Sequence, residues 1–201
     1  MVSSGVRWLA EEQEGDWAHA LLFARGVAPE ELARRLGGVR GPVSGVLTGS
    51  AALNLVLDPS GQSPDLVRVG AHGGWSFAVE YGFGGGAAHR LDEISRHGVE
   101  AICLDPSPDH PPMTFAYARD GLDVCGFGIG EECWRWGGNP DLLLPELVAA
   151  GILHPDGTQA FEDGPHRDRV RDTLALIEDR FGLALPRGAL WDEPLPAFVI
   201  R

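Results

Sequence analysis

LVRVGAHGGWSFAVE (residues 66–80), VEAICL (99–104), TFAYARDGLDVCGF (114–127) and WRWGGNPD (134–141) are the stretches of sequence that decide the fold class. In the first three, apolar residues alternate with polar or small ones. Side chains of a strand point to alternate faces, so Trp75, Phe77 and Val79 are expected on one face. A glycine-rich loop and the Asp120-Gly121 pair, a type I′ turn signal, connect the strands as hairpins. The run from Asp65 to Gly151 therefore predicts an antiparallel β-meander that turns a tryptophan-rich corner.

Helices are expected beside this meander. Pro29 begins one, followed by acids that favour a helix N-terminus. Others are predicted over 88–97, over 140–150 with Asn139 as the cap, and over 166–181, where apolar residues form a helical stripe. With a further strand over 17–24, the pattern predicts an α+β fold. We expect an antiparallel sheet of five or six strands with three or four helices packed on one face.

The length of 201 residues predicts a single domain over residues 1–201. Within it we expect a sheet-and-helix core over 17–151. Residues 41–64 are rich in glycine, proline and serine and are interpreted as a flexible insertion with one short helix. A C-terminal helix and an extended tail are predicted over 165–201.

Composition excludes several classes of protein. The net charge of −13 argues against nucleic-acid binding, which needs a basic surface. The longest uncharged apolar run, Leu47–Leu57, is too short for a membrane span, which needs about 20 residues. The first 16 residues carry one arginine and four acids, unlike a signal peptide. We therefore predict a cytoplasmic protein without a membrane partner.

The acidic charge is concentrated in one part of the chain. Between Asp120 and Asp163 there are nine acids and a single base, Arg135, so this stretch carries −8 of the total charge. Such a surface could attract a basic protein, with Glu131 and Glu132 as candidate contacts. A solvated acidic surface that only keeps the protein in solution is the alternative explanation.

The sequence predicts no cofactor, no metal ion and no catalytic residue. Residues 82–87 match the G-x-G-x-x-G/A dinucleotide pattern, but the preceding strand alternates as an antiparallel strand does. The three cysteines form no C-x-x-C pair. His89, Glu93 and His97 are spaced for one helix face but lack a fourth ligand. His72 could form an acid–base pair with Glu80 across the hairpin, although capping of the loop amides is the simpler role.

Trp134, Arg135 and Trp136 give the strongest functional signal, because tryptophan and arginine are enriched at binding hot spots. We expect one of these tryptophans in the core and the other exposed, as a contact for a partner or ligand. Trp75 and Glu80, on the strand before the glycine loop, are the remaining candidate contacts.

Three motifs together resemble a family of small actinobacterial proteins of unknown function. They are Phe23-Ala24-Arg25-Gly26 with Pro29-Glu30-Glu31-Leu32, then Gly74-Trp75-Ser76-Phe77-Ala78-Val79-Glu80, then Arg135-Trp136-Gly137 with Asn139-Pro140-Asp141. The resemblance covers residues 17–151 and implies no activity, cofactor or catalytic residue.

These observations predict an acidic cytoplasmic protein-interaction module without catalytic activity. Immunity-like neutralisation of a basic protein partner would suit its charge. The alternative is a small-molecule-binding protein or enzyme with a pocket near Trp75, Glu80 and Trp136. A third possibility is a structural subunit of a larger assembly.

Overall fold

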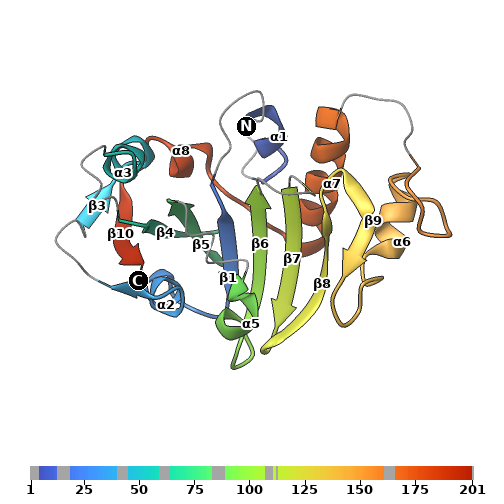
Figure 1. Ribbon diagram of the computed structural model, residues 1–201, viewed down its shortest axis with the longest axis horizontal. Helices are drawn as coiled ribbons and strands as arrows, with labels where there is room; N and C mark the ends of the chain where they lie inside the picture. Colours follow the sequence, from blue (N-terminus) through green and yellow to red (C-terminus); the bar gives the residue numbers. More distant parts are fainter. Residues whose placement is uncertain are drawn as a thin grey trace.

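The structure is a computed structural model that describes residues 5–12, 19–39, 45–58, 64–82, 89–106, 111, 113–160 and 166–200 (Figure 1). The strands are β1 (Leu21–Arg25), β2 (Gly38–Val39), β3 (Gly45–Leu47), β4 (Leu66–His72), β5 (Trp75–Tyr81), β6 (Glu100–Pro106), β7 (Met113–Arg119), β8 (Leu122–Gly128), β9 (Glu131–Trp136) and β10 (Leu195–Ile200). The helices are α1 (Leu9–Glu12), α2 (Pro29–Arg35), α3 (Gly49–Val56), α5 (Leu91–Ile94), α6 (Leu144–Ala149), α7 (His166–Phe181) and α8 (Arg187–Leu190).

The described residues form one ten-stranded antiparallel sheet in the order β2-β10-β4-β5-β1-β6-β7-β8-β9, with β3 also pairing with β10. The prediction of five or six strands is wrong, because β2, β3, β9 and β10 were missed. β2 and β3 have two and three residues, too few to show an alternating pattern. β10 comes from the predicted extended tail, and its Ala197, Phe198 and Val199 pair with β4.

Helices pack on both faces of the sheet, so the prediction of helices on one face is also wrong. One face, here the α7 face, packs Phe23, Phe77 and Phe115 with the apolar stripe of α7. The opposite face, here the α2 face, packs β-strand residues such as Leu22 and Cys103 with α2 and α5. Every residue of β5 is buried, because the central strands are covered on both sides. Figure 1 looks onto the α2 face, with α7 behind β7 and β8.

Helix boundaries were predicted with mixed success. The helix over 166–181 is confirmed as α7, and Pro29 begins α2 as expected. α6 begins only at Leu144, because residues from Asn139 onward first form turns. The helix predicted over 88–97 is a single turn, and His97 has a φ of 65° outside it. His89, Glu93 and His97 therefore do not share one helix face.

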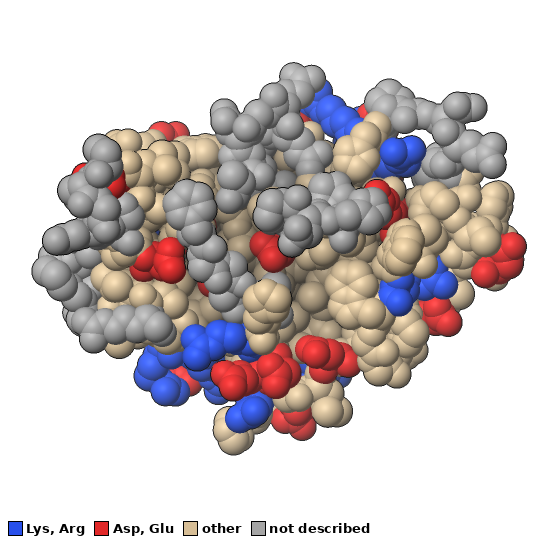
Figure 2. Space-filling model, in the orientation of Figure 1, with Lys and Arg blue, Asp and Glu red and all other residues tan. Residues whose placement is uncertain are grey.

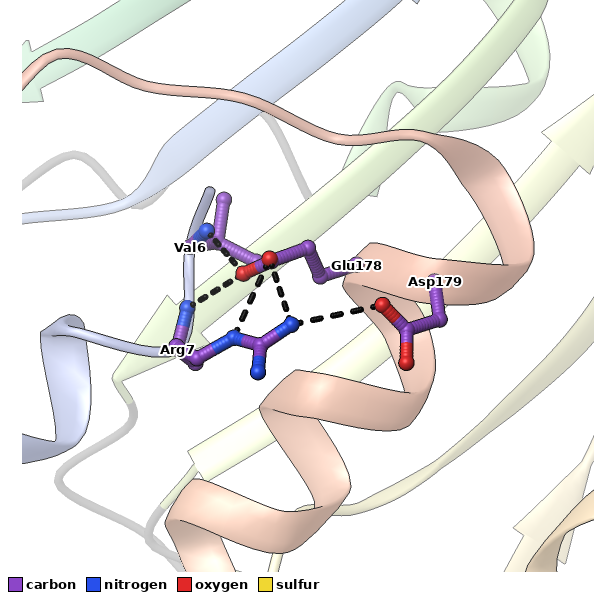
Figure 3. Close-up of polar contacts among 4 residues, drawn as sticks. All are labelled: Val6, Arg7, Glu178 and Asp179. Carbon is purple, nitrogen blue, oxygen red and sulfur yellow. Dashed lines mark hydrogen bonds and ion pairs between the residues drawn. The ribbon is translucent and has the colours of Figure 1, made fainter. Parts of the chain in front are cut away.

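The N-terminal segment is attached to α7 through Glu178 (Figure 3). The Glu178 carboxylate accepts hydrogen bonds from the backbone N–H groups of Val6 and Arg7, at 2.8 and 3.1 Å. It also accepts two from the Arg7 guanidinium, at 3.1 and 2.7 Å. Burial alone would raise the pKa of Glu178, but these hydrogen bonds outweigh burial and lower it. Trp8 beside them is buried and donates to the carbonyl of Leu185.

A buried arginine holds the other end of the sheet together. Arg68 on β4 is fully buried and donates to the carbonyl oxygens of Leu47, Leu190 and Glu193 and to the hydroxyl of Tyr81. Within the described part of the chain no carboxylate is paired with this guanidinium. The carbonyl oxygens take the place of a counter-ion, and they tie the segments before α3 and around α8 to the sheet.

Candidate functional site

Trp75 on β5 has a structural role, because it contacts the C-terminal end of α7. Its ring is buried on the α7 face, and its Nε1–H donates to the carbonyl of Phe181 at 3.3 Å. The guanidinium of Arg25 lies 4.2 Å from the ring centroid and donates to the same carbonyl at 2.8 Å. Trp75 and Arg25 together supply donors for the Phe181 carbonyl, which has no partner within its own helix. The role of Trp75 is therefore to hold the end of α7 against the sheet.

Glu80 lies on the opposite face of the sheet from Trp75. It is two residues beyond Ala78, which packs in the core of the α2 face, and only 9% of it is exposed. Trp136 shares the α2 face but lies five strands away, which is about 24 Å at the usual strand spacing. The structure therefore does not bring Trp75, Glu80 and Trp136 into one pocket. Nor does it pair Glu80 with His72, which lies at the hairpin turn while Glu80 pairs with Val67.

Glu132 is a buried structural carboxylate. It is fully buried, and it accepts hydrogen bonds from the N–H of Gly130 at 2.6 Å and from the hydroxyl of Thr173 at 2.5 Å. Its second oxygen accepts from the amide of Gln159 at 3.0 Å. These contacts fasten β9 to α7 and to the segment after α6. Glu132 therefore cannot contact a partner at the surface, although nothing in the local sequence distinguishes it from Glu131.

Arg135 also connects parts of the chain. Its side chain donates to the carboxylate of Asp141 at 3.0 Å and to the carbonyl oxygens of Glu132 and Gly157, each at 3.1 Å. Only 14% of the side chain is exposed. The guanidinium is engaged by the protein itself, so the tryptophans beside it are the better candidates for contact with a partner.

Trp134 and Trp136 are both exposed, at 63% and 42%. We expected one of them in the core, but residues two apart in an extended strand share a face. Trp136 pairs with Gly126 on β8, and its ring lies over this glycine on the α2 face. A Cβ atom at Gly126 would lie 2.5 Å from the indole, so the glycine makes room for the ring. Glu131, at the other end of β9, is partly buried.

Three polar residues, Asp105, Thr114 and Glu131, lie on the α2 face near Trp136, and Gly128 separates Glu131 from the other two. Asp105 on β6 pairs with Thr114, Thr114 pairs with Gly128, and Gly128 pairs with Glu131. Asp105 and Thr114 are partly exposed. Figure 2 shows this face: the side chains visible over the lower part of β7 and β8 are mainly uncharged, and both acidic and basic side chains lie around them.

Burial raises the pKa of two groups on this face, the Asp105 carboxyl and the Cys103 thiol. Burial raises the pKa of Asp105, and the nearby His89 partly opposes this effect. Burial also raises the pKa of the Cys103 thiol, and the carboxylates of Asp105 and Glu80 raise it further. The Cys103 thiol therefore stays protonated, as expected for a buried, unreactive cysteine. Within the described ranges no group of three or more His, Cys, Asp or Glu residues is arranged to hold a metal ion.

Sequence reasoning missed Asp105 and Thr114 as surface residues of this site. A signal was available for Asp105, because Ala101, Cys103 and Asp105 follow one another at period two and must share a face. The sequence could not show that Thr114 and Glu131 lie on the same face, since this depends on the register of three strand pairs.

The acidic stretch over 120–163 exposes fewer unpaired acidic side chains than its sequence indicates. Glu132 is buried, Asp141 is paired with Arg135, and Glu146 is paired with Arg180 at 3.3 Å. Glu162 and Asp163 lie outside the described residues. The exposed acids that remain described are Asp120, Asp123 and Asp156.

None of the helices in the described ranges is long and apolar enough to cross a membrane. A family model described as "Family of unknown function (DUF6461)" matches residues 4–191. The chain therefore belongs to this family of unknown function. Comparison of the chain with curated proteins and with solved structures gives no match.

Proposed function

We propose that this member of the family is a cytoplasmic protein-interaction module that binds a basic partner protein through the α2 face at β8 and β9. The observation that carries the proposal is the exposure of Trp134 and Trp136, at 63% and 42%, on the terminal strand of the sheet. Large aromatic side chains dominate the energetics of protein interfaces, and two of them side by side form a candidate hot spot.

Charge favours a basic partner over an acidic one. The chain carries a net charge of −13, and Asp105 and Asp123 lie on the same face as Trp136, on strands within reach of it. Complementary charge accelerates association and disfavours acidic partners. Neutralisation of a basic toxin by an immunity-like protein is one biological form of such binding, and an actinobacterial origin would be consistent with it.

Affinity capture tests this proposal. The tagged protein is incubated with host lysate at low and high salt, and any retained basic protein is purified and its binding measured directly. We expect a partner that binds at low salt and is released at high salt, because screening weakens attraction between exposed charges. Trp134→Ser and Trp136→Ser should each weaken binding by at least tenfold.

Two exposed apolar residues elsewhere provide matched controls. Leu122 on the α7 face is 69% exposed and Val46 on β3 is 64% exposed. Leu122→Ser and Val46→Ser should leave binding unchanged. If the tryptophan variants bind as well as the unaltered protein, or if the controls weaken binding equally, the interface lies elsewhere and the proposal fails.

A further inference from the structure

The α2 face between β6 and β9 combines a carboxylate, a hydroxyl and an indole around small side chains. We name this area the Asp105–Trp136 surface and define it by Asp105, Thr114, Ala116 and Trp136. On β7, Thr114 pairs with Asp105 and Ala116 pairs with Cys103, so β7 presents only small side chains here. The neighbouring β8 contributes two glycines: the Trp136 ring lies over Gly126, and the Pro111 side chain lies over Gly128 beside Thr114. Asp105 and Trp136 thus stand on either side of Thr114 and Ala116.

The chemistry of this surface suits a planar cation. A carboxylate binds a guanidinium through charge-assisted hydrogen bonds, and a hydroxyl can accept a further one. An indole face attracts the same cation and packs against its alkyl chain. A guanidinium is weakly hydrated and planar, so it loses less on leaving water than the compact ammonium of lysine.

A bound cation would stabilise the charged form of the Asp105 carboxylate. Its carboxylate is partly buried on the sheet, and burial raises its pKa, which means that its charged form is poorly solvated. The titratable groups that face it are His89, and Glu80 and Cys103 on the neighbouring part of the face. An arriving guanidinium would supply the charge-assisted hydrogen bonds that water supplies only in part.

We infer that the Asp105–Trp136 surface binds an arginine side chain of the basic partner, with the guanidinium between the Asp105 carboxylate and the Thr114 hydroxyl and beside the Trp136 indole. This inference rests on the proposed function, since it names the partner residue that the same face receives. It also makes a claim about small ligands that can be tested without the partner.

The test uses butylguanidinium as the probe for an arginine side chain, with butylammonium and neutral N-butylurea as comparisons. Binding is measured by two-dimensional NMR on the full chain at neutral pH and low salt. We expect butylguanidinium to bind in the millimolar range and to shift signals of β6–β9, butylammonium to bind at least threefold more weakly, and butylurea not to bind.

Two variants locate the site. Asp105→Asn removes the negative charge with little change in shape. The variant should stay folded, because a neutral side chain is tolerated at this partly buried position. The substitution should weaken butylguanidinium binding at least tenfold. Asp192→Asn, which removes an exposed charge from the segment before β10 near the other end of the sheet, is the matched control and should leave binding within twofold. An unchanged NMR fingerprint away from β6–β9 shows that each variant is folded.

The outcomes separate this inference from the proposed function. No binding of butylguanidinium, or equal binding to Asp105→Asn, would overturn the inference even if a partner protein is captured through the tryptophans. Binding that depends on Asp105, together with failure to capture any basic partner, would support the cation site and count against the proposed function. Capture of a partner whose affinity falls with Asp105→Asn would support both.

Discussion

His19 makes the stability of this protein depend on pH between 7 and 5. Its imidazole is buried, 4.4 Å from the ring of Tyr81 and 5.7 Å from that of Trp191, measured between ring centroids. Burial, and to a lesser extent the positive charge of Arg68, lower the pKa of His19 from 6.5 to about 4, although a hydrogen bond with the Glu80 backbone partly opposes them.

The sign follows from comparing the folded and unfolded chains. An unfolded chain binds a proton at His19 near pH 6.5, whereas the folded protein does so only near pH 4. Stability from the neutral imidazole is therefore fully present above pH 6.5 and is lost as the pH falls towards 4. The whole difference corresponds to about 3 kcal/mol, of which about 2 kcal/mol is lost between pH 7 and pH 5.

Urea unfolding at pH 7 and pH 5 measures this loss, with His19→Gln as a variant that cannot titrate but keeps a donor. The free energy of unfolding of the unaltered protein should fall by about 2 kcal/mol more than that of the variant. NMR titration should find the His19 imidazole neutral at pH 5. An equal fall in both proteins, or an imidazole that titrates near 6.5, would refute the reasoning.

Three other side chains have testable structural roles. Glu132→Ala should lower the free energy of unfolding by roughly 3 kcal/mol, since it leaves the buried N–H of Gly130 and the buried hydroxyl of Thr173 without their acceptor; Glu131→Ala, measured beside it by urea unfolding, should cost much less. Arg68→Met should cost roughly 3–5 kcal/mol and lower the melting temperature, because carbonyl oxygens around it lose their donor; a change below 1 kcal/mol would contradict this role. Glu178→Gln should expose the N-terminal segment to limited proteolysis at pH 7, and the protection seen in the unaltered protein should itself disappear as the pH falls through the lowered pKa of Glu178.

The sequence predicts secondary structure best where turn residues and hydrophobic periodicity indicate the same element. The Asp120-Gly121 pair has φ values of 50° and 81° and joins β7 to β8 as predicted, because glycine readily adopts such a turn and aspartate tolerates it. The apolar stripe of Val170, Leu174, Ile177 and Phe181 predicts a helix over 166–181, and α7 has these bounds.

Candidate contacts were harder to predict, because exposure depends on residues far away in the chain. Glu131 and Glu132 are adjacent acids, yet Glu132 is buried since Thr173 and Gln159 supply donors for it. Trp75 is likewise buried because the end of α7 lies against it. Charge counted along the chain therefore overestimated the acidic surface.

The sequence by itself determined the hairpins of the meander, the helix α7 and the acidic character of the chain. These features depend on backbone preferences and on side chains close together in sequence. Only the tertiary structure decided that β10 pairs with β4, that both faces of the sheet are covered, and that Asp105, Thr114 and Trp136 lie on one surface. Strand order and register are set by long-range packing, because a one-residue slip would move every side chain to the opposite face.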